Sequence, residues 1–301
     1  MNVDWIAIDW GTSNLRAYAM GPEGCIAEAA SDDGMGQLAP EAFEGALLRL
    51  VEPWLAAGRV TPVIACGMVG SRQGWQEAPY RAVPCAPLDP GSLVAVATRD
   101  ARIAVRLVPG LKQMKPADVM RGEETQIAGA LALMPGFEGV LCLPGTHSKW
   151  VHLSAGEVVS FQTCMTGEMF ALLSEQSVLR HGMAGPGWDE AAFDEALSDA
   201  LSRPERVGTR LFALRAEGLL AGLAPGEARA RLSGMLIGLE LAGARAYWLG
   251  QPVAIVGAEK LSGHYARALR AQGASVRLLS ARDTVLAGLT RAVRGAMERT
   301  T

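Results

Sequence analysis

Two stretches of the sequence resemble each other closely enough to indicate an internal duplication. When Gly11 is aligned with Gly145, residues 6–24 (IAIDWGTSNLRAYAMGPEG) match residues 140–158 (VLCLPGTHSKWVHLSAGEV), and threonine follows the aligned glycine in both. In each stretch an apolar run enters a Gly-Thr turn, an alternating run follows, and a small-residue turn leads to a third run. We therefore predict that one structural unit occurs twice and that each copy begins with a three-stranded meander.

Helical and strand patterns continue each copy in a similar order. After the first meander we expect an amphipathic helix near residues 43–55, the strands PVIACG and ARIAVRLV, and a helix over residues 121–133. After the second we expect helices over residues 189–202, 209–221 and 225–248, the strand PVAIVG, a helix over 260–272, the strand SVRLL and a final helix from Arg282. The chain is thus predicted to be an α/β protein with a duplicated βββαβαβα unit, and two similar lobes imply a cleft between them.

Composition narrows the class of protein. The chain has 301 residues and is 50% hydrophobic, which suffices for two medium cores, and its 28 Lys and Arg nearly balance its 31 Asp and Glu. That balance argues against nucleic acid or an anionic membrane as a partner. The five cysteines form no C-x-x-C pair, and no apolar run approaches the roughly 18 residues of a membrane span. We expect a cytoplasmic protein with reduced cysteines.

The two Gly-Thr turns are candidate phosphate-binding loops. Facing each other across a cleft, they would offer backbone amides and hydroxyls to phosphate oxygens. Asp9 precedes the first turn and aligns with Leu143 in the second copy, so a single carboxylate is available to hold magnesium, mainly through water. The alternative is an ordinary hairpin turn with a turn-favouring aspartate.

Several motifs, taken as a set, resemble the 2-dehydro-3-deoxygalactonokinase family of the sugar-kinase, hexokinase and actin superfamily. They are IAIDWGTSNLRAY, GMVGS, MRGEETQ, LPGTHSKWV and MTGE. The resemblance spans nearly the whole chain and implies two ribonuclease H-like lobes, residues 1–135 and 136–301, with an ATP and substrate cleft between them. It also implies Mg²⁺-dependent transfer of phosphate from ATP to the 6-hydroxyl of 2-dehydro-3-deoxy-D-galactonate, a small-molecule sugar acid of galactonate catabolism. A homodimer is left open.

The resemblance also implies which residues bind the nucleotide. The first phosphate loop would comprise Asp9, also the metal ligand, with Gly11, Thr12, Ser13 and Asn14. The second would comprise Gly145, Thr146, His147, Ser148 and Lys149, and the adenosine turn would be Gly257, Ala258 and Glu259. Many superfamily members have a glycine-rich second loop, whereas this chain has His147 and Lys149, which either reach the β- or γ-phosphate or are solvated hairpin side chains.

Phosphoryl transfer needs a base for the acceptor hydroxyl, and the segment RGEETQ is the candidate. It is predicted to open a helix where related sugar kinases place their catalytic carboxylate. The spacing of Glu124 and Gln126 matches an aspartate and amide in relatives and favours Glu124, while Glu123, directly after the glycine, stays in play. The alternative is that both glutamates only favour the helix dipole.

A sugar acid also requires a group that binds its carboxylate, and the planar guanidinium fork suits that task. The candidates are Arg16, Arg72 and Arg121, each of which could instead be solvated or paired structurally. Gly67, Met68 and Ser71 of GMVGS occupy in the first copy the place of the adenosine turn, so we assign them to substrate. The histidines show no metal-binding spacing.

Other functions remain open on the sequence alone. A phosphatase of the same fold would use both phosphate loops with water as the acceptor. A kinase for another sugar or sugar acid, such as 2-dehydro-3-deoxygluconate, would differ only in acceptor contacts. A non-catalytic filament protein or regulator would bind ATP without transferring phosphate.

Overall fold

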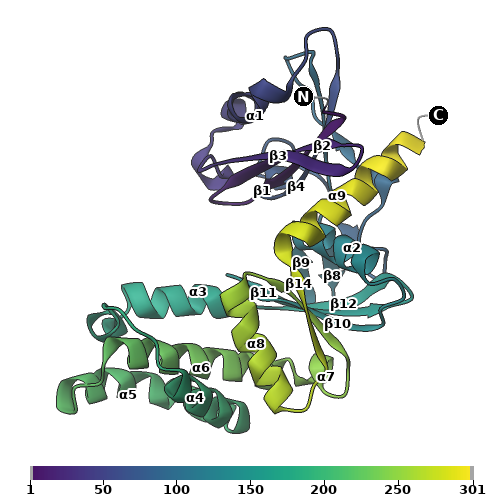
Figure 1. Ribbon diagram of the computed structural model, residues 1–301. Helices are drawn as coiled ribbons and strands as arrows, with labels where there is room; N and C mark the ends of the chain where they lie inside the picture. Colours follow the sequence, from purple (N-terminus) through teal and green to yellow (C-terminus); the bar gives the residue numbers. More distant parts are fainter. Residues whose placement is uncertain (1–2, 299–301) are drawn as a thin grey trace. The chain divides into compact units, whose positions relative to one another are not determined.

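The computed structural model describes residues 3–298 as an α/β protein, which confirms the predicted fold class (Figure 1). The chain divides into two compact units. The first comprises residues 1–137, 153–160 and 280–301, and the second comprises residues 138–152 and 161–279. The last helix therefore groups with the N-terminal residues. The expected functional division near residue 135 stays a prediction.

The first unit contains the meander predicted at the start of the chain. Strands β1 (Trp5–Trp10), β2 (Leu15–Gly21) and β3 (Gly24–Ser31) pair antiparallel in sequence order. Strand β4 (Thr61–Gly67) then pairs parallel to β1, and β7 (Ile103–Leu107) pairs parallel to β4. With β6 (Val94–Ala95) at the edge, the sheet has the order β3-β2-β1-β4-β7-β6.

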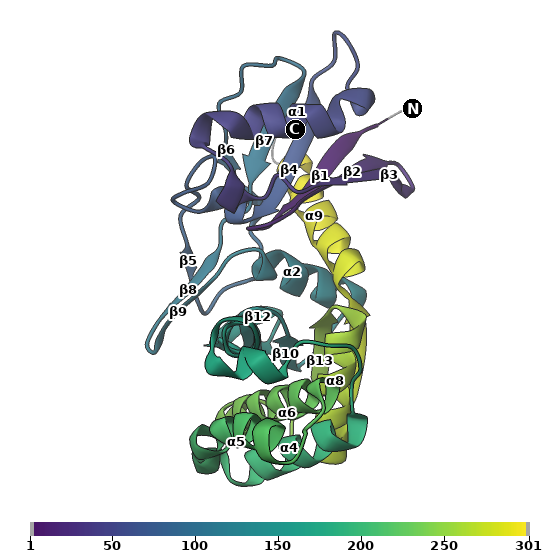
Figure 2. The same cartoon turned by 90° about the vertical axis from the view of Figure 1, so that its left-hand side faces the viewer.

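Helices cover both faces of this sheet (Figure 2). Side chains alternate along β1, so Ile6 and Ile8 pack with helix α1 (Phe43–Val51), whereas Ala7 faces the opposite cluster. That second cluster contains residues of α2 (Glu123–Leu133) and α9 (Ala281–Glu298). Two apolar layers thereby fix the central strands β1 and β4, whose carboxyl ends carry the candidate site.

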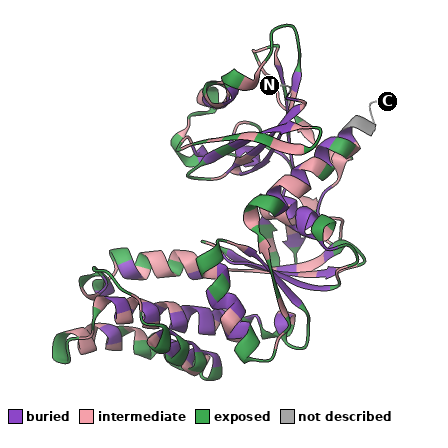
Figure 3. Cartoon of the chain, in the orientation of Figure 1, coloured by how far each residue is buried: buried purple, intermediate pink, exposed green. Residues whose placement is uncertain are grey.

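The second sheet repeats the order of the first. Its strands are β10 (Gly139–Leu143), β11 (Ser148–Ser154), β12 (Glu157–Cys164), β13 (Val253–Gly257) and β14 (Val276–Ser280), in the order β12-β11-β10-β13-β14. As in the first sheet, the opening strand β10 pairs parallel to the fourth strand, β13. Both are almost fully buried (Figure 3), as expected for strands covered on both faces. The repeat seen in the sequence is therefore a repeat of topology.

The two halves differ in the segments inserted between their strands. The second carries α3 (Thr166–Ala171), α4 (Glu190–Ser202), α5 (Val207–Leu220), α6 (Pro225–Gly243), α7 (Arg245–Trp248) and α8 (Glu259–Ala271). The single helix expected over residues 225–248 is interrupted at Ala244, which leaves α6 and α7 as separate helices. In the first half, β4 and β7 are joined by turns and short strands rather than by an α-helix.

A third, small sheet was not predicted from the sequence. Strands β5 (Arg81–Ala82), β8 (Leu111–Met114) and β9 (Ala117–Met120) pair in the order β5-β8-β9. Figure 2 shows β8 and β9 as a hairpin that leads back into α2. This sheet therefore delivers the chain to the start of the helix that bears the candidate base.

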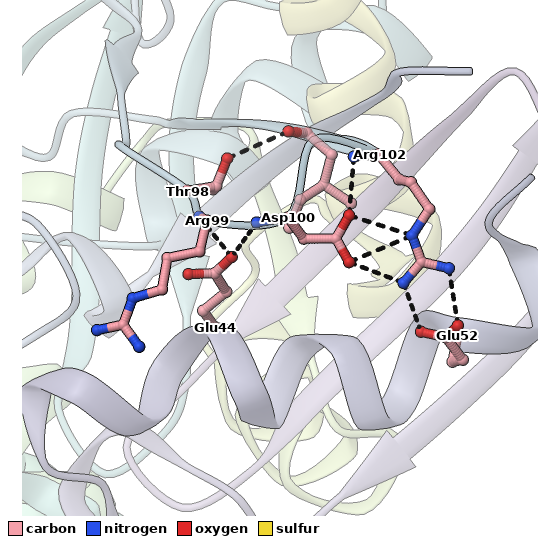
Figure 4. Close-up of polar contacts among 7 residues, drawn as sticks. Glu44, Glu52, Thr98, Arg99, Asp100 and Arg102 are labelled. Atoms are coloured by element: carbon pink, nitrogen blue, oxygen red, sulfur yellow. Dashed lines mark hydrogen bonds and ion pairs between the residues drawn. The ribbon is translucent and has the colours of Figure 1, made fainter. Parts of the chain in front are cut away.

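An ion-pair network ties α1 to the loop before β7 (Figure 4). Arg102 pairs with Glu52 at 2.8 Å and with Asp100 at 2.7 Å. Glu44 accepts hydrogen bonds from the backbone N–H groups of Arg99 and Asp100. A guanidinium that contacts carboxylates through two nitrogens is held in a defined orientation as well as being neutralised. The network therefore helps to position the loop before β7 against α1.

Within residues 3–298, every helix is too short or too polar to span a bilayer.

Candidate active site

The first Gly-Thr turn is a tight, exposed hairpin between β1 and β2. The Gly11 N–H donates to the Asn14 carbonyl at 2.9 Å, which closes the turn. The side chains of Thr12, Ser13 and Asn14 are exposed. Their hydroxyl and amide groups can therefore contact a ligand, as predicted for a phosphate loop.

A glycine-containing segment that the sequence analysis missed holds this turn from behind. The N–H groups of Met35 and Gly36 donate to the carbonyls of Gly11 and Thr12 at 3.0 and 2.9 Å. A Cβ atom at Gly34 would lie 2.3 Å from the Thr12 carbonyl oxygen, so only glycine permits this approach. The segment after β3 thus supports the predicted phosphate loop.

The second Gly-Thr turn is held in the same way. The Glu168 N–H donates to the Thr146 carbonyl at 3.0 Å, and a Cβ atom at Gly167 would lie 2.3 Å from the Gly145 carbonyl oxygen. The residues that provide this support belong to the MTGE motif. In both halves, a glycine shortly after the third strand of the meander is the signal that could have identified the contact.

The remaining residues of the second loop have distinct environments. His147 is exposed, and its Nε2 lies 2.7 Å from a carboxylate oxygen of Glu168. Lys149 is buried, and its ammonium group donates to the His147 carbonyl at 3.0 Å. Thr146 is exposed. Of the predicted residues, Thr146 and His147 can reach a ligand directly, whereas Lys149 stabilises the turn.

Ser148 belongs to a buried polar network beneath the second turn. Its hydroxyl lies 3.2 Å from that of Tyr265, which donates to Glu240 at 2.7 Å, and Trp150 donates to the other Glu240 carboxylate oxygen at 2.8 Å. Burial raises the pKa of Glu240. The network joins β11, α6 and α8, so the second turn and the predicted adenosine helix are anchored to each other.

A pocket of about 430 Å³ in the second unit brings the second turn together with the adenosine turn. Gly145 and Thr146 line this pocket, and so does Ala258, the residue before α8. The adenosine turn and the second Gly-Thr turn approach closely at Gly257, because a Cβ there would lie 3.3 Å from the Pro144 carbonyl oxygen. Glu259 is exposed and does not line the pocket.

Other residues of this pocket were missed by the sequence analysis. They are Thr166, Gly167, Phe170, Trp188, Ser233, Leu236, Ile237, Lys260, Leu261, His264 and Tyr265. The Trp188 ring lies 5.0 Å from the His264 ring, and the Lys260 ammonium lies 5.3 Å from the same indole. The spacing of residues 261, 264 and 265 on α8 could have indicated one helix face, but the partner Trp188 comes from a distant loop. A mostly apolar pocket with aromatic walls suits a purine base.

Asp9 lies near the carboxyl end of β1, in register with Arg16 on β2. The two side chains form an ion pair at 3.5 Å. Burial raises the pKa of Asp9 above its usual value, the nearby Arg16 opposes this shift, and the charge of Glu123 adds to it. Asp9 and Glu123 therefore act on each other electrostatically, although they are far apart in sequence.

Close backbone contact at Gly67 explains why these residues meet. A Cβ at Gly67 would lie 2.6 Å from the Trp10 carbonyl oxygen, and a Cβ at Gly122 would lie 3.3 Å from the Gly67 Cα. Both glycines have positive φ, 95° and 107°. The ends of the parallel strands β1 and β4 and the start of α2 thus converge, and such carboxyl ends are where α/β proteins bind ligands.

The two glutamates at the start of α2 differ in exposure. Glu124 is fully buried, and its carboxylate accepts hydrogen bonds from the Gly122 N–H at 2.7 Å and the Thr125 hydroxyl at 3.1 Å. Burial, helped by the charge of Glu123, raises the pKa of Glu124 to about 8. Glu123 is half-buried, and it accepts a hydrogen bond from the Arg121 backbone N–H at 3.0 Å.

The candidate substrate residues are also placed differently from one another. Arg16 and Arg72 are exposed, whereas Arg121 is buried. Met68 is half-buried and Ser71 is buried in the turn that follows β4. The turn GMVGS and the segment RGEETQ, separate in sequence, are therefore neighbours in the first unit, as the contact between Gly67 and Gly122 requires.

Across residues 3–298 no three His, Cys, Asp or Glu side chains cluster as a metal site. A single carboxylate, Asp9, fits Mg²⁺ that keeps most of its water and phosphate ligands. It does not fit a metal held by protein side chains alone.

Two solved structures share the fold of this chain at low sequence identity. The structure of the activator of 2-hydroxyisocaproyl-CoA dehydratase from Clostridium difficile, with bound ADPNP, matches with a TM-score of 0.54 at 12% identity, over 98% of this chain and 96% of that one. Component A of the Acidaminococcus fermentans (R)-2-hydroxyglutaryl-CoA dehydratase matches with a TM-score of 0.50 at 12% identity, over 97% and 98%. These likenesses concern the fold alone.

The chain belongs to the 2-keto-3-deoxy-galactonokinase family, whose model matches residues 9–292. A Rhizobium meliloti (strain 1021) protein named as a probable 2-dehydro-3-deoxygalactonokinase is 41% identical over 96% of both chains. The Escherichia coli (strain K12) 2-dehydro-3-deoxygalactonokinase is 34% identical over 96% of this chain and 97% of that one. A crystal structure of a Sinorhizobium meliloti protein bearing the same name has a TM-score of 0.88 at 41% identity, over 96% and 98%.

The raised pKa of Glu124 predicts a specific pH dependence of stability. The folded state holds this proton more tightly than the unfolded state, so the contribution to stability is complete below pH 4.5 and is lost as the pH rises through about 8. Relative to Glu124→Gln, the wild-type protein should lose up to about 1.4 kcal/mol per pH unit in this window. Urea unfolding of both proteins from pH 5 to 9 measures the difference. Parallel curves would contradict the assignment.

Proposed function

We propose that this chain is an ATP- and Mg²⁺-dependent kinase that phosphorylates the 6-hydroxyl of 2-dehydro-3-deoxy-D-galactonate. The family match and the names of the relatives support this substrate. The observation that carries the proposal is the convergence, in the first unit, of Asp9, the turn after β4 and the two glutamates of α2. A small-molecule acceptor and a cytoplasmic role in galactonate catabolism follow from this activity.

We assign the nucleotide to the second Gly-Thr turn and the pocket beside it. Trp188 and the apolar residues of α6 would contact the adenine, while Thr146 and His147 would lie at the phosphates. The first turn, with Thr12, Ser13 and Asn14 exposed, would bind the transferring phosphate. In this proposal residues 1–135 bind the acceptor and residues 136–301 bind the nucleoside.

Asp9 is the proposed Mg²⁺ ligand. When bound with ATP, the ion would neutralise charge that develops on the phosphate oxygens. The chain's own contribution is to hold Asp9 at the end of β1 beside Arg16, whose charge favours the ionised carboxylate. The support from Gly34 and Gly36 keeps the adjoining turn in place for the transferring group.

We propose Glu123 as the base that accepts the proton of the 6-hydroxyl, with Glu124 as the alternative. Sequence spacing favours Glu124, but its full burial and a pKa of about 8 favour a neutral carboxyl. Its two hydrogen bonds, from the Gly122 N–H and the Thr125 hydroxyl, hold it at the helix start. Two neighbouring carboxyls in different environments commonly divide such roles. Glu123 is more exposed to solvent than Glu124, and its charge acts on Asp9.

The acceptor is tested by measuring ADP release with a panel of compounds. The panel contains 2-dehydro-3-deoxy-D-galactonate, 2-dehydro-3-deoxy-D-gluconate, neutral aldoses and a control without acceptor. The galactonate derivative should give the highest kcat/KM, because the relatives carry its name, and the control should release almost no ADP. Equal ADP release without acceptor would mean that water takes the phosphate, and would support a phosphatase. A preference for another compound would support a kinase for that compound.

The base is tested with the matched variants Glu123→Gln and Glu124→Gln. Removing a general base costs typically about 100- to 10,000-fold, so Glu123→Gln should lower kcat by that order with little change in KM for ATP. Glu124→Gln should cost much less, since it alters only the helix start. A larger loss of kcat in Glu124→Gln than in Glu123→Gln would assign the base to Glu124. Near-normal kcat values in both variants would show that this segment does not supply the base. Circular dichroism checks that both variants are folded.

A further inference from the structure

The Arg121 side chain is buried with most of its hydrogen-bonding capacity unused. It is 8% exposed, and neither Nε nor Nη1 has a hydrogen-bond partner among the described residues. Nη2 donates to the Ala78 carbonyl at 2.8 Å, and the guanidinium stacks on the Tyr80 ring at 4.3 Å from its centre. The contacts that it makes therefore orient the group without neutralising its charge.

A second unpartnered donor lies in the adjoining turn. The Ser71 hydroxyl is buried, with 6% of the residue exposed, and it also lacks a partner in the described part of the chain. The preceding residue, Gly70, lies against the guanidinium, because a Cβ there would be 3.0 Å from Nη1. Two elements, the turn after β4 and the start of α2, thus bring unsatisfied donors together.

Such an arrangement is costly unless something completes it. Burying a cation without a counter-charge is strongly unfavourable, and an unsatisfied buried donor adds to the cost. A guanidinium has two edges that can each donate two parallel hydrogen bonds to a carboxylate. The bond from Nη2 to Ala78 engages only one edge, so the other stays open to an anion.

We infer that Arg121 binds the carboxylate of the sugar-acid substrate, with Ser71 as a second donor and Tyr80 orienting the guanidinium. This inference rests on the proposed function and selects one of the three candidate arginines. Arg16 is paired with Asp9, and Arg72 is exposed. The carboxylate and the 6-hydroxyl lie at opposite ends of the substrate. Arg121 contacts Gly70 and Tyr80, whereas the charge of Glu123 acts on Asp9.

The decisive variant is Arg121→Met, which keeps an unbranched side chain but removes the charge. A carboxylate-binding role predicts that the free protein is as stable as wild type or more stable, because an uncompensated buried cation is lost. It also predicts that kcat/KM for the acid falls about 100-fold or more, mainly through KM. For the uncharged methyl ester of the same acid, kcat/KM should stay near the wild-type value. Thermal unfolding with and without each compound gives a second readout, in which only the acid loses its stabilising effect.

A structural role for Arg121 predicts the opposite pattern. The free Arg121→Met protein would then be much less stable, and its preference for acid over ester would equal that of wild type, which would overturn the inference. If Arg121→Met does not fold, Arg121→Lys retains the charge without the guanidinium fork and should still reduce the preference for acid over ester.

Arg81→Lys, beside Tyr80 in sequence, is the matched control and should leave the preference for acid over ester unchanged. Loss of the preference in Arg72→Lys alone would also overturn the inference. A wild-type protein that neither binds nor phosphorylates the acid would instead refute the proposed function.

Discussion

The approach of three backbone segments at Gly67 is the constraint on which the proposed acceptor site depends. A side chain at Gly67 would collide with the Trp10 carbonyl, and Gly122 lies directly against Gly67. Because β1, β4 and α2 meet without intervening side chains, Asp9 comes within electrostatic reach of Glu123, and Arg121 packs against the turn that carries Ser71. The chemistry proposed for the site requires these groups to converge, and the convergence is a property of the backbone.

Close backbone contact at a glycine also occurs at the two Gly-Thr turns. Each turn is closed by a hairpin, and each is supported through its carbonyl oxygens by a glycine-containing segment that follows the third strand, at Gly34 in one half and Gly167 in the other. Phosphate loops that bind through backbone amides and hydroxyls must keep their shape when charge moves. The two halves therefore share this support as well as their sheet topology, although their inserted segments differ.

The sequence was sufficient to predict the duplicated meander, the succession of the main strands along the chain and the position of α2, because these follow from local periodicity and from the repeat. It could not predict the third sheet, whose strands are only two to four residues long. It also could not separate Glu123 from Glu124, because the difference is one of burial against distant segments. Trp188 and the unpartnered atoms of Arg121 could not be predicted for the same reason: their roles depend on neighbours far away in sequence.

The most direct test of the account is the identity of the phosphorylated product. Proton–phosphorus correlation by NMR, on a reaction with ATP, Mg²⁺ and 2-dehydro-3-deoxy-D-galactonate, reports which carbon bears the new phosphate. We expect one phosphomonoester, coupled to the two protons on C6 and formed in equal amount to ADP. Release of inorganic phosphate alone, or a phosphate on another carbon, would contradict it.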